Sequence, residues 1–249
     1  MSHDNIESSV CIQSRHSETE PFILLSALLP GILAAFALYM NRSEGHLLFR
    51  ATGFPIWVLG IFSTILIPLF ILEWSRQGLA DIRLTDPEGN PLKRSDSFRI
   101  YLASFVRLVW TLLLILILVW FFSEVAGLFL SILGTGTGDE KILATFYAYL
   151  VALLPLMTLA AFMLLLLQAF KHHVPALVAG AFLYILLRSL TYLNNPIGKY
   201  NPALYMDWHL RWLDSSINMA SLWREAAYLF VLFLVFFTAG YWLFARKIR

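Results

Sequence analysis

The sequence predicts an all-α membrane protein: a bundle of six transmembrane helices, with a cytoplasmic loop after the second helix and an interfacial outer segment before the last. Of its 249 residues, 59% are hydrophobic and 14% are charged, whereas soluble domains carry roughly 25% charged residues. The mean hydropathy is +0.71. Apolar stretches of about 20 residues, long enough to cross a bilayer core of ~30 Å as helix, recur along the chain. The alternation at period two that marks barrel strands is absent.

These stretches divide the chain into a tail at residues 1–20 and a transmembrane domain at residues 21–249. The tail is polar and lacks the basic start and cleavage site of a signal peptide, so we expect a soluble cytoplasmic tail from which nothing is removed. The third span either ends near residue 122 or continues through residues 129–133. The six spans run approximately over residues 21–40, 55–74, 100–122, 143–170, 174–193 and 226–244.

Lysine and arginine in the connections predict the orientation, because cytoplasmic loops carry the positive excess. With the N-terminus inside, the inner segments hold ten of these residues and the outer segments hold six. Both termini are therefore expected in the cytoplasm. Arg107 and Arg188 lie within apolar spans near opposite ends, from which their side chains can reach the interface. Aromatic residues near span ends, such as Trp74, Trp120 and Trp242, suit the headgroup level.

Charge and cysteine usage exclude several classes of protein. A net charge of +2 on so apolar a chain leaves no cationic face for nucleic acid. Cys11 is the one cysteine, and no Cys/His cluster has zinc-site spacing. All 16 acidic residues lie in tails, loops or span ends. Ion-coupled carriers need ionisable groups at depth, and a membrane hydrolase needs a base beside a nucleophile, so both are disfavoured.

Other candidate sites in the sequence are weak. The glycine-rich run at residues 134–138 lacks the Lys-Ser/Thr ending of a P-loop and is interpreted as a turn. His172 and His173 are adjacent and point about 100° apart on a helix, which makes them poor joint metal ligands. Asp207 and His209 flank Trp208 and form either a pH-sensitive pair, part of a site, or a solvated interfacial pair. Pro155 predicts a kink in the fourth span.

Two connections stand out from the rest. The polar stretch at residues 76–99 has a turn at residues 86–91 and an apolar strip formed by Leu79, Ile82 and Leu84. This loop either docks on a partner or is solvated. The outer connection at residues 191–224 is semi-apolar, and we expect its side chains to be covered, because burying each large one is worth roughly 1.5 to 3 kcal/mol. It is predicted to form a lid through Tyr205, Trp208 and Trp212, or else a simple headgroup anchor.

The order of these parts resembles the membrane subunit of bacterial ABC exporters of the type-2 permease family. The last third is most similar, in the stretches LLLLQAFKHHVPALVAG, NNPIGKYNPALYM and GYWLFARKIR. Glu73, Arg76 and Gly78 resemble the residues with which such permeases leave the second span. The chain departs from the family in its short acidic tail and in the turn that interrupts the loop after the second span.

The resemblance implies an energy source outside this chain. A cytoplasmic ABC ATPase subunit, holding ATP and Mg, would dock on a coupling loop at residues 76–99 through Arg76, Leu79, Ile82, Arg83 and Leu84. The chain itself would have no catalytic residue, cofactor or metal. It would pair with a second permease copy or a related permease in the bilayer of a bacterial inner membrane and export a substrate that the sequence leaves open.

Two alternatives belong to other classes. The chain is either a membrane scaffold or immunity subunit that transports nothing, or a lipid-modifying enzyme that uses Asp207 and His209.

Overall fold

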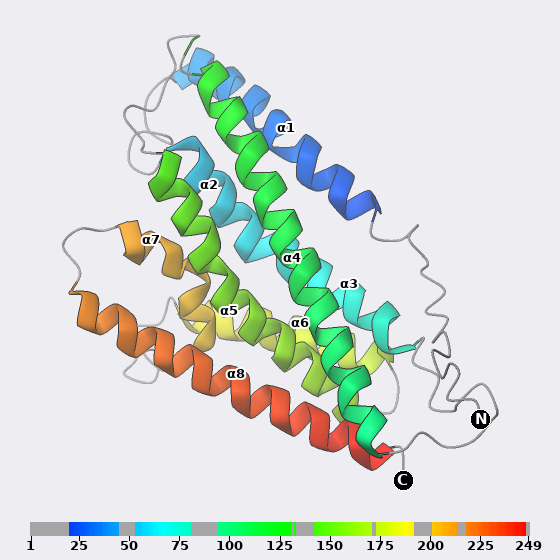
Figure 1. Cartoon of the computed structure of the whole chain (residues 1–249). Coiled ribbons are helices and arrows are strands. Elements are labelled where there is room, and N and C mark those ends of the chain that lie inside the picture. Colours follow the sequence, from blue (N-terminus) through cyan, green and yellow to red (C-terminus); the bar gives the residue numbers. More distant parts are fainter. Residues whose placement is uncertain are drawn as a thin grey trace, which may run out of the picture.

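The structure, a computed structural model, describes residues 20–44, 53–80, 94–130, 132, 142–170, 173–191, 201–213 and 218–247. These residues are almost entirely helical and contain no strand (Figure 1). The predicted helical bundle is therefore confirmed. Its elements are α1 (Glu20–Glu44), α2 (Phe54–Ile61), the π-helical turn η2 (Phe62–Leu66), α3 (Ile67–Ala80), α4 (Arg94–Leu130), α5 (Ile142–Ala169), α6 (His173–Leu190), the 3₁₀ segment η5 (Pro202–Asp207), α7 (Trp208–Leu213) and α8 (Met219–Lys247).

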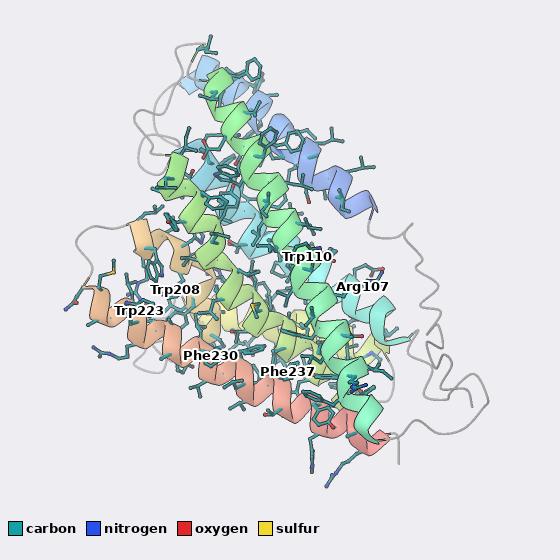
Figure 2. All side chains as sticks on the ribbon, viewed as in Figure 1. Arg107, Trp110, Trp208, Trp223, Phe230 and Phe237 are labelled. Atoms are coloured by element: carbon teal, nitrogen blue, oxygen red, sulfur yellow. The ribbon has the colours of Figure 1, made fainter. Side chains whose placement is uncertain are left out.

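Four helical stretches of the described chain are long and apolar enough to cross a membrane. They are Phe54–Glu73, Ser97–Leu130, Ile142–Ala169 and Met219–Arg246. Shorter apolar stretches, Ile23–Tyr39 and Val174–Leu190, occupy α1 and α6, where the sequence predicts the first and fifth spans. Large apolar side chains on these helices are exposed, and Trp110 and Trp223 project from the bundle surface (Figure 2). This surface is compatible with a membrane protein, since soluble monomers rarely expose wide apolar patches.

Helix α4 continues past residue 122 through Ser123 and Glu124 to Leu130, in line with the longer of the two expected forms of the third span. The Ser123 hydroxyl donates to the Trp120 carbonyl at 2.8 Å and lies 3.1 Å from the Tyr149 hydroxyl. The Glu124 carboxylate accepts a hydrogen bond from the Thr145 hydroxyl. Because both polar side chains have hydrogen-bond partners, they can lie inside the bundle without interrupting the helix. Its 37 residues span about 55 Å at 1.5 Å per residue.

The long helices alternate in direction, and contacts at the two ends of the bundle fix this arrangement. At one end, the Tyr149 hydroxyl near the start of α5 donates to the Pro55 carbonyl at the start of α2, at 2.8 Å. At the other end, Tyr101 near the start of α4 lies 5.6 Å from Phe244 near the end of α8, measured between ring centroids. We call these the α7 end and the C-terminal end. Helices α4 and α8 meet at the C-terminal end and diverge toward the α7 end (Figure 1).

Helix α5 is the central helix of the described bundle. It packs against α3, α4, α6, α7 and α8, while α1 lies along α4 (Figure 1). In the most apolar stretch of α5, 56% of the residues are buried inside the bundle, compared with 17% in the corresponding stretch of α8. The α5 helix runs through Pro155 as one continuous element. The bundle core is therefore organised around a helix that neighbours cover on most sides.

The turn η2 interrupts the candidate second span, Phe54–Glu73, at its middle. The Ser63 and Thr64 hydroxyls both donate to the Gly60 carbonyl, at 3.3 and 2.6 Å. The Tyr184 hydroxyl of α6 donates to the Thr64 carbonyl at 2.6 Å. A π-helical turn perturbs the regular backbone ladder, and these side chains satisfy carbonyls at that point. The Tyr184 bond ties α6 to the second span.

Gly240 permits the close approach of α8 to α4 and α5. A Cβ atom at this position would overlap the Tyr101 hydroxyl and lie 3.4 Å from the Leu165 Cα atom. The Tyr101 ring is itself hemmed in by Phe237, with ring centroids 5.1 Å apart, and by Phe244. The hydroxyl therefore has little room to move away from an added methyl group.

We expect Gly240→Ala to lower the free energy of unfolding by about 1 to 3 kcal/mol, the usual cost of overpacking. Thermal unfolding in lipid vesicles measures this change. Gly31→Ala in α1 is the matched control, because nothing lies within 4 Å of the added Cβ there. It should be neutral or stabilising by about 0.5 to 1 kcal/mol. Equal stability of the two variants would contradict close packing at Gly240.

Candidate functional site

The candidate site lies at the α7 end of the bundle, where residues 201–213 cover the ends of α5, α6 and α8. We call these residues the cap segment. Asn201 starts it: the side-chain Oδ1 accepts from the Ala203 N–H at 3.0 Å, and Nδ2 donates to the Leu187 carbonyl at 2.6 Å. Pro202 occupies the next position, where a missing N–H costs nothing. One asparagine thus begins the 3₁₀ segment and ties it to the end of α6.

Arg188 and Asp207 hold the cap segment to α6 by charge. The Arg188 Nη2 atom lies 2.5 Å from Asp207 Oδ2, and Nη1 donates to the Ala203 carbonyl at 3.1 Å. Both side chains are partly exposed. The sequence predicts an arginine that reaches the interface and leaves a pH-sensitive pair, part of a site and a solvated pair open for Asp207 and His209. The structure places the Asp207 carboxylate on Arg188. Arg188 and Asp207 are 19 residues apart in the chain, and no pattern in the sequence predicts that they pair.

Trp208 and Glu225 hold the cap segment to α8. The Trp208 Nε1–H donates to Glu225 Oε2 at 2.9 Å, and Arg211 pairs with the other oxygen of the same carboxylate. The Trp208 side chain is 2% exposed. Its ring meets that of Trp212 edge to face, with centroids 5.5 Å apart, and Trp212 meets Trp223 in the same way at 6.3 Å. The indole and the carboxylate therefore form one partly buried contact between α7 and α8.

His209 is fully buried next to these contacts. Neither ring nitrogen has a hydrogen-bond partner within the described part of the chain. Burial lowers the pKa of His209 to about 4, against the opposing effect of the Asp207 charge. The imidazole is consequently neutral at pH 7. The sequence marks His209 as a candidate but does not predict its burial, because the surrounding segment reads as interfacial.

An apolar cavity of about 110 Å³ lies beneath the cap segment. Helix α5 contributes Pro155 and Leu159 to its wall, α6 contributes Leu187, and α8 contributes Leu229. Ala203 and Met206 of η5 close it on the cap side. Hydropathy does not reveal such a cavity, since its lining residues look like ordinary core.

The structure also contains a cluster of hydrogen-bonded polar side chains between α4 and α5, which the sequence does not predict. The Thr145 hydroxyl donates to Glu124 and accepts from the Trp120 Nε1–H at 3.3 Å. Tyr149 and Ser123 continue the cluster toward α2. The sequence gives one sign of this cluster: Ser123 and Glu124 directly follow the apolar run that ends at Phe122. This cluster fastens three helices at the α7 end.

Two of the predicted coupling residues lie on α3 at the C-terminal end of the bundle, opposite the cap segment. Arg76 and Leu79 belong to the last turns of α3, whereas Ile82, Arg83 and Leu84 lie outside the described residues. The glycine-rich run at 134–138 and His172 lie outside them as well. Within the described ranges, no group of three or more His, Cys, Asp or Glu side chains can hold a metal ion.

No family model matches the chain, and no curated protein or solved structure is significantly similar to it.

Proposed function

We propose that the chain is the transmembrane permease subunit of an ABC exporter, moved by a separate cytoplasmic ATP-binding subunit and paired with a second copy or a related permease. The observation that carries this proposal is the composition of α5. The central helix of the bundle has 28 residues and contains no Asp, Glu, Lys, Arg or His. A carrier driven by an ion gradient needs ionisable groups near such a position. Energy must then reach the bundle from outside it.

The direction of the helices supports the same proposal. Helix α3 ends and α4 begins at the C-terminal end, so the connection between them joins the bundle opposite the cap segment (Figure 1). In the proposed orientation this end is cytoplasmic, α1 and α6 also cross the bilayer, and both chain termini lie inside a bacterial inner membrane. An ATPase at residues 76–99 would push directly on the second and third spans, while the cap segment would cover the path on the other side.

Affinity purification of the tagged full chain from its native membranes, in mild detergent, tests the proposal. We expect a protein that reacts with a photoreactive ATP analogue to co-purify in fixed proportion. Replacing Leu79, Ile82 and Leu84 by Ser should remove that protein. The matched control replaces Leu204, Leu210 and Leu213, three partly exposed leucines of the cap segment, by Ser and should retain it. Recovery of a different membrane protein alone would instead favour a scaffold, and lipid turnover by the isolated chain would favour an enzyme.

We further predict the sidedness of the two ends. Single cysteines at Ser95 and Ser215, introduced in a chain with Cys11→Ser, should react with an impermeant thiol reagent from opposite sides of the membrane. Ser215 should react in intact cells, and Ser95 only after the cells are opened. Reaction of Ser95 in intact cells would reverse the orientation and remove the docking surface from the cytoplasm.

A further inference from the structure

The cavity beneath the cap segment is suited to an apolar guest. It is partly open, and its walls come from four elements: α5, α6, η5 and α8. Helices α6 and α8 both pack against α5, and each contributes residues to the cavity wall. Next to the lining residues, Ile185 and Leu186 of α6 and Phe230 of α8 are exposed on the outer surface. The cavity wall therefore belongs to helices that also expose large apolar side chains on the outside of the bundle.

The polar atoms in its wall are already satisfied. The Thr158 hydroxyl lies within hydrogen-bond distance of two carbonyl oxygens, that of Leu154 at 3.0 Å and that of Leu229 at 3.3 Å, and can donate to either. The Tyr184 hydroxyl donates to the Thr64 carbonyl at 2.6 Å. A buried water needs two to four polar partners, and an apolar cavity without them stays dry. The occupant must therefore be apolar.

The size of the cavity limits the occupant further. An engineered cavity of about 150 Å³ in another protein takes up benzene or xenon, and this one has about 110 Å³. That space admits a few methylene groups, which excludes a whole lipid but accommodates the end of a flexible chain. In a bilayer, the apolar molecules that reach this surface in quantity are lipid hydrocarbon chains.

We infer that the cavity binds the end of one hydrocarbon chain of a membrane lipid. Tyr184 gives this site a link to the rest of the bundle, because it lines the cavity and also bonds the π-helical turn η2. A chain in the cavity packs against the residue that joins α6 to the second span. The inference does not rest on the proposed function, since it concerns a lipid and not the transported substrate.

Photolabelling in vesicles tests this inference. The full chain is reconstituted in phosphatidylcholine that includes a lipid with a diazirine at the end of one acyl chain, and labelled residues are found by mass spectrometry after irradiation. Leu159 and Met206 are buried in the cavity wall and should be labelled, whereas Leu112 and Leu116, which are buried in the bundle core away from the cavity, should not. Val106 and Trp110 are exposed on α4 and report general labelling by surrounding lipid.

Filling the cavity provides the matched comparison. Ala203→Leu should lower the yield at Leu159 and Met206 to about a tenth, the change that corresponds to about 1.4 kcal/mol of lost binding, and leave Val106 and Trp110 unchanged. If this variant does not fold, Leu187→Trp fills the cavity from the α6 wall. Labelling of Leu159 and Met206 no greater than that of Leu112 and Leu116 would overturn the inference. An undiminished yield in a folded, cavity-filled variant would also overturn it.

Discussion

Trp208→Ala should lower the free energy of unfolding by about 3 to 5 kcal/mol, the usual cost of removing a buried tryptophan or phenylalanine. Three losses combine in this variant. A buried ring disappears, its edge-to-face contact with Trp212 is broken, and Glu225 loses its indole donor. Unfolding in lipid vesicles, followed by denaturant titration, measures the change.

Trp223→Ala is the matched control for this prediction. Trp223 belongs to the same aromatic cluster but is 66% exposed, so its removal should cost much less. Equal losses for the two variants would contradict the burial of Trp208.

A polar double replacement of Trp208 and Trp212 separates the two interpretations of the cap segment, a lid over the transport path or a headgroup anchor. A lid should lose substrate-dependent ATPase stimulation even where the chain remains folded, whereas an anchor should lose stability alone.

Acid should weaken the fold through His209. The pKa of His209 is lowered to about 4 in the folded chain, whereas the ordinary value is about 6.5. Between these pH values the unfolded chain binds more protons than the folded chain does. The contribution of His209 to the free energy of unfolding is therefore fully present above about pH 6.5 and is lost as the pH falls toward 4. The difference corresponds to about 3 kcal/mol. Unfolding in vesicles at a series of pH values measures the loss.

His209→Gln isolates this contribution. Glutamine does not titrate, so the variant should lack the part of the pH dependence that lies between about 6.5 and 4. Comparison of the two curves removes every contribution to the pH dependence that the two proteins share. Identical curves for the variant and the original chain would contradict a buried, neutral His209.

Long-range packing decides which parts of this molecule the sequence predicts. Apolar run length is a local property, so the helical bundle and its four strongest spans follow from hydropathy alone. The apolar residues 129–133 already suggest that the third span continues past residue 122. The hydrogen bonds of Ser123 and Glu124 do not follow from hydropathy, because their partners Tyr149 and Thr145 lie on another helix. The π-helical turn η2 likewise depends on a hydroxyl from α6.

The candidate site divides in the same way. Tyr205, Trp208 and His209 are recognisable in the sequence as an apolar, aromatic segment that needs cover. Their partners are not, because Glu225 and Arg188 reach the cap segment from two different helices. The cavity is a property of how four elements meet, and none of its lining residues differs from ordinary core in type.

The rate of ATP hydrolysis by the co-purified ATP-binding protein, measured in vesicles with and without the chain, tests the permease proposal most directly. We predict that the chain raises this rate and that the variant with Leu79, Ile82 and Leu84 replaced by Ser does not, while the cap-segment control variant still does. Equal rates in vesicles with and without the folded chain would contradict the proposal.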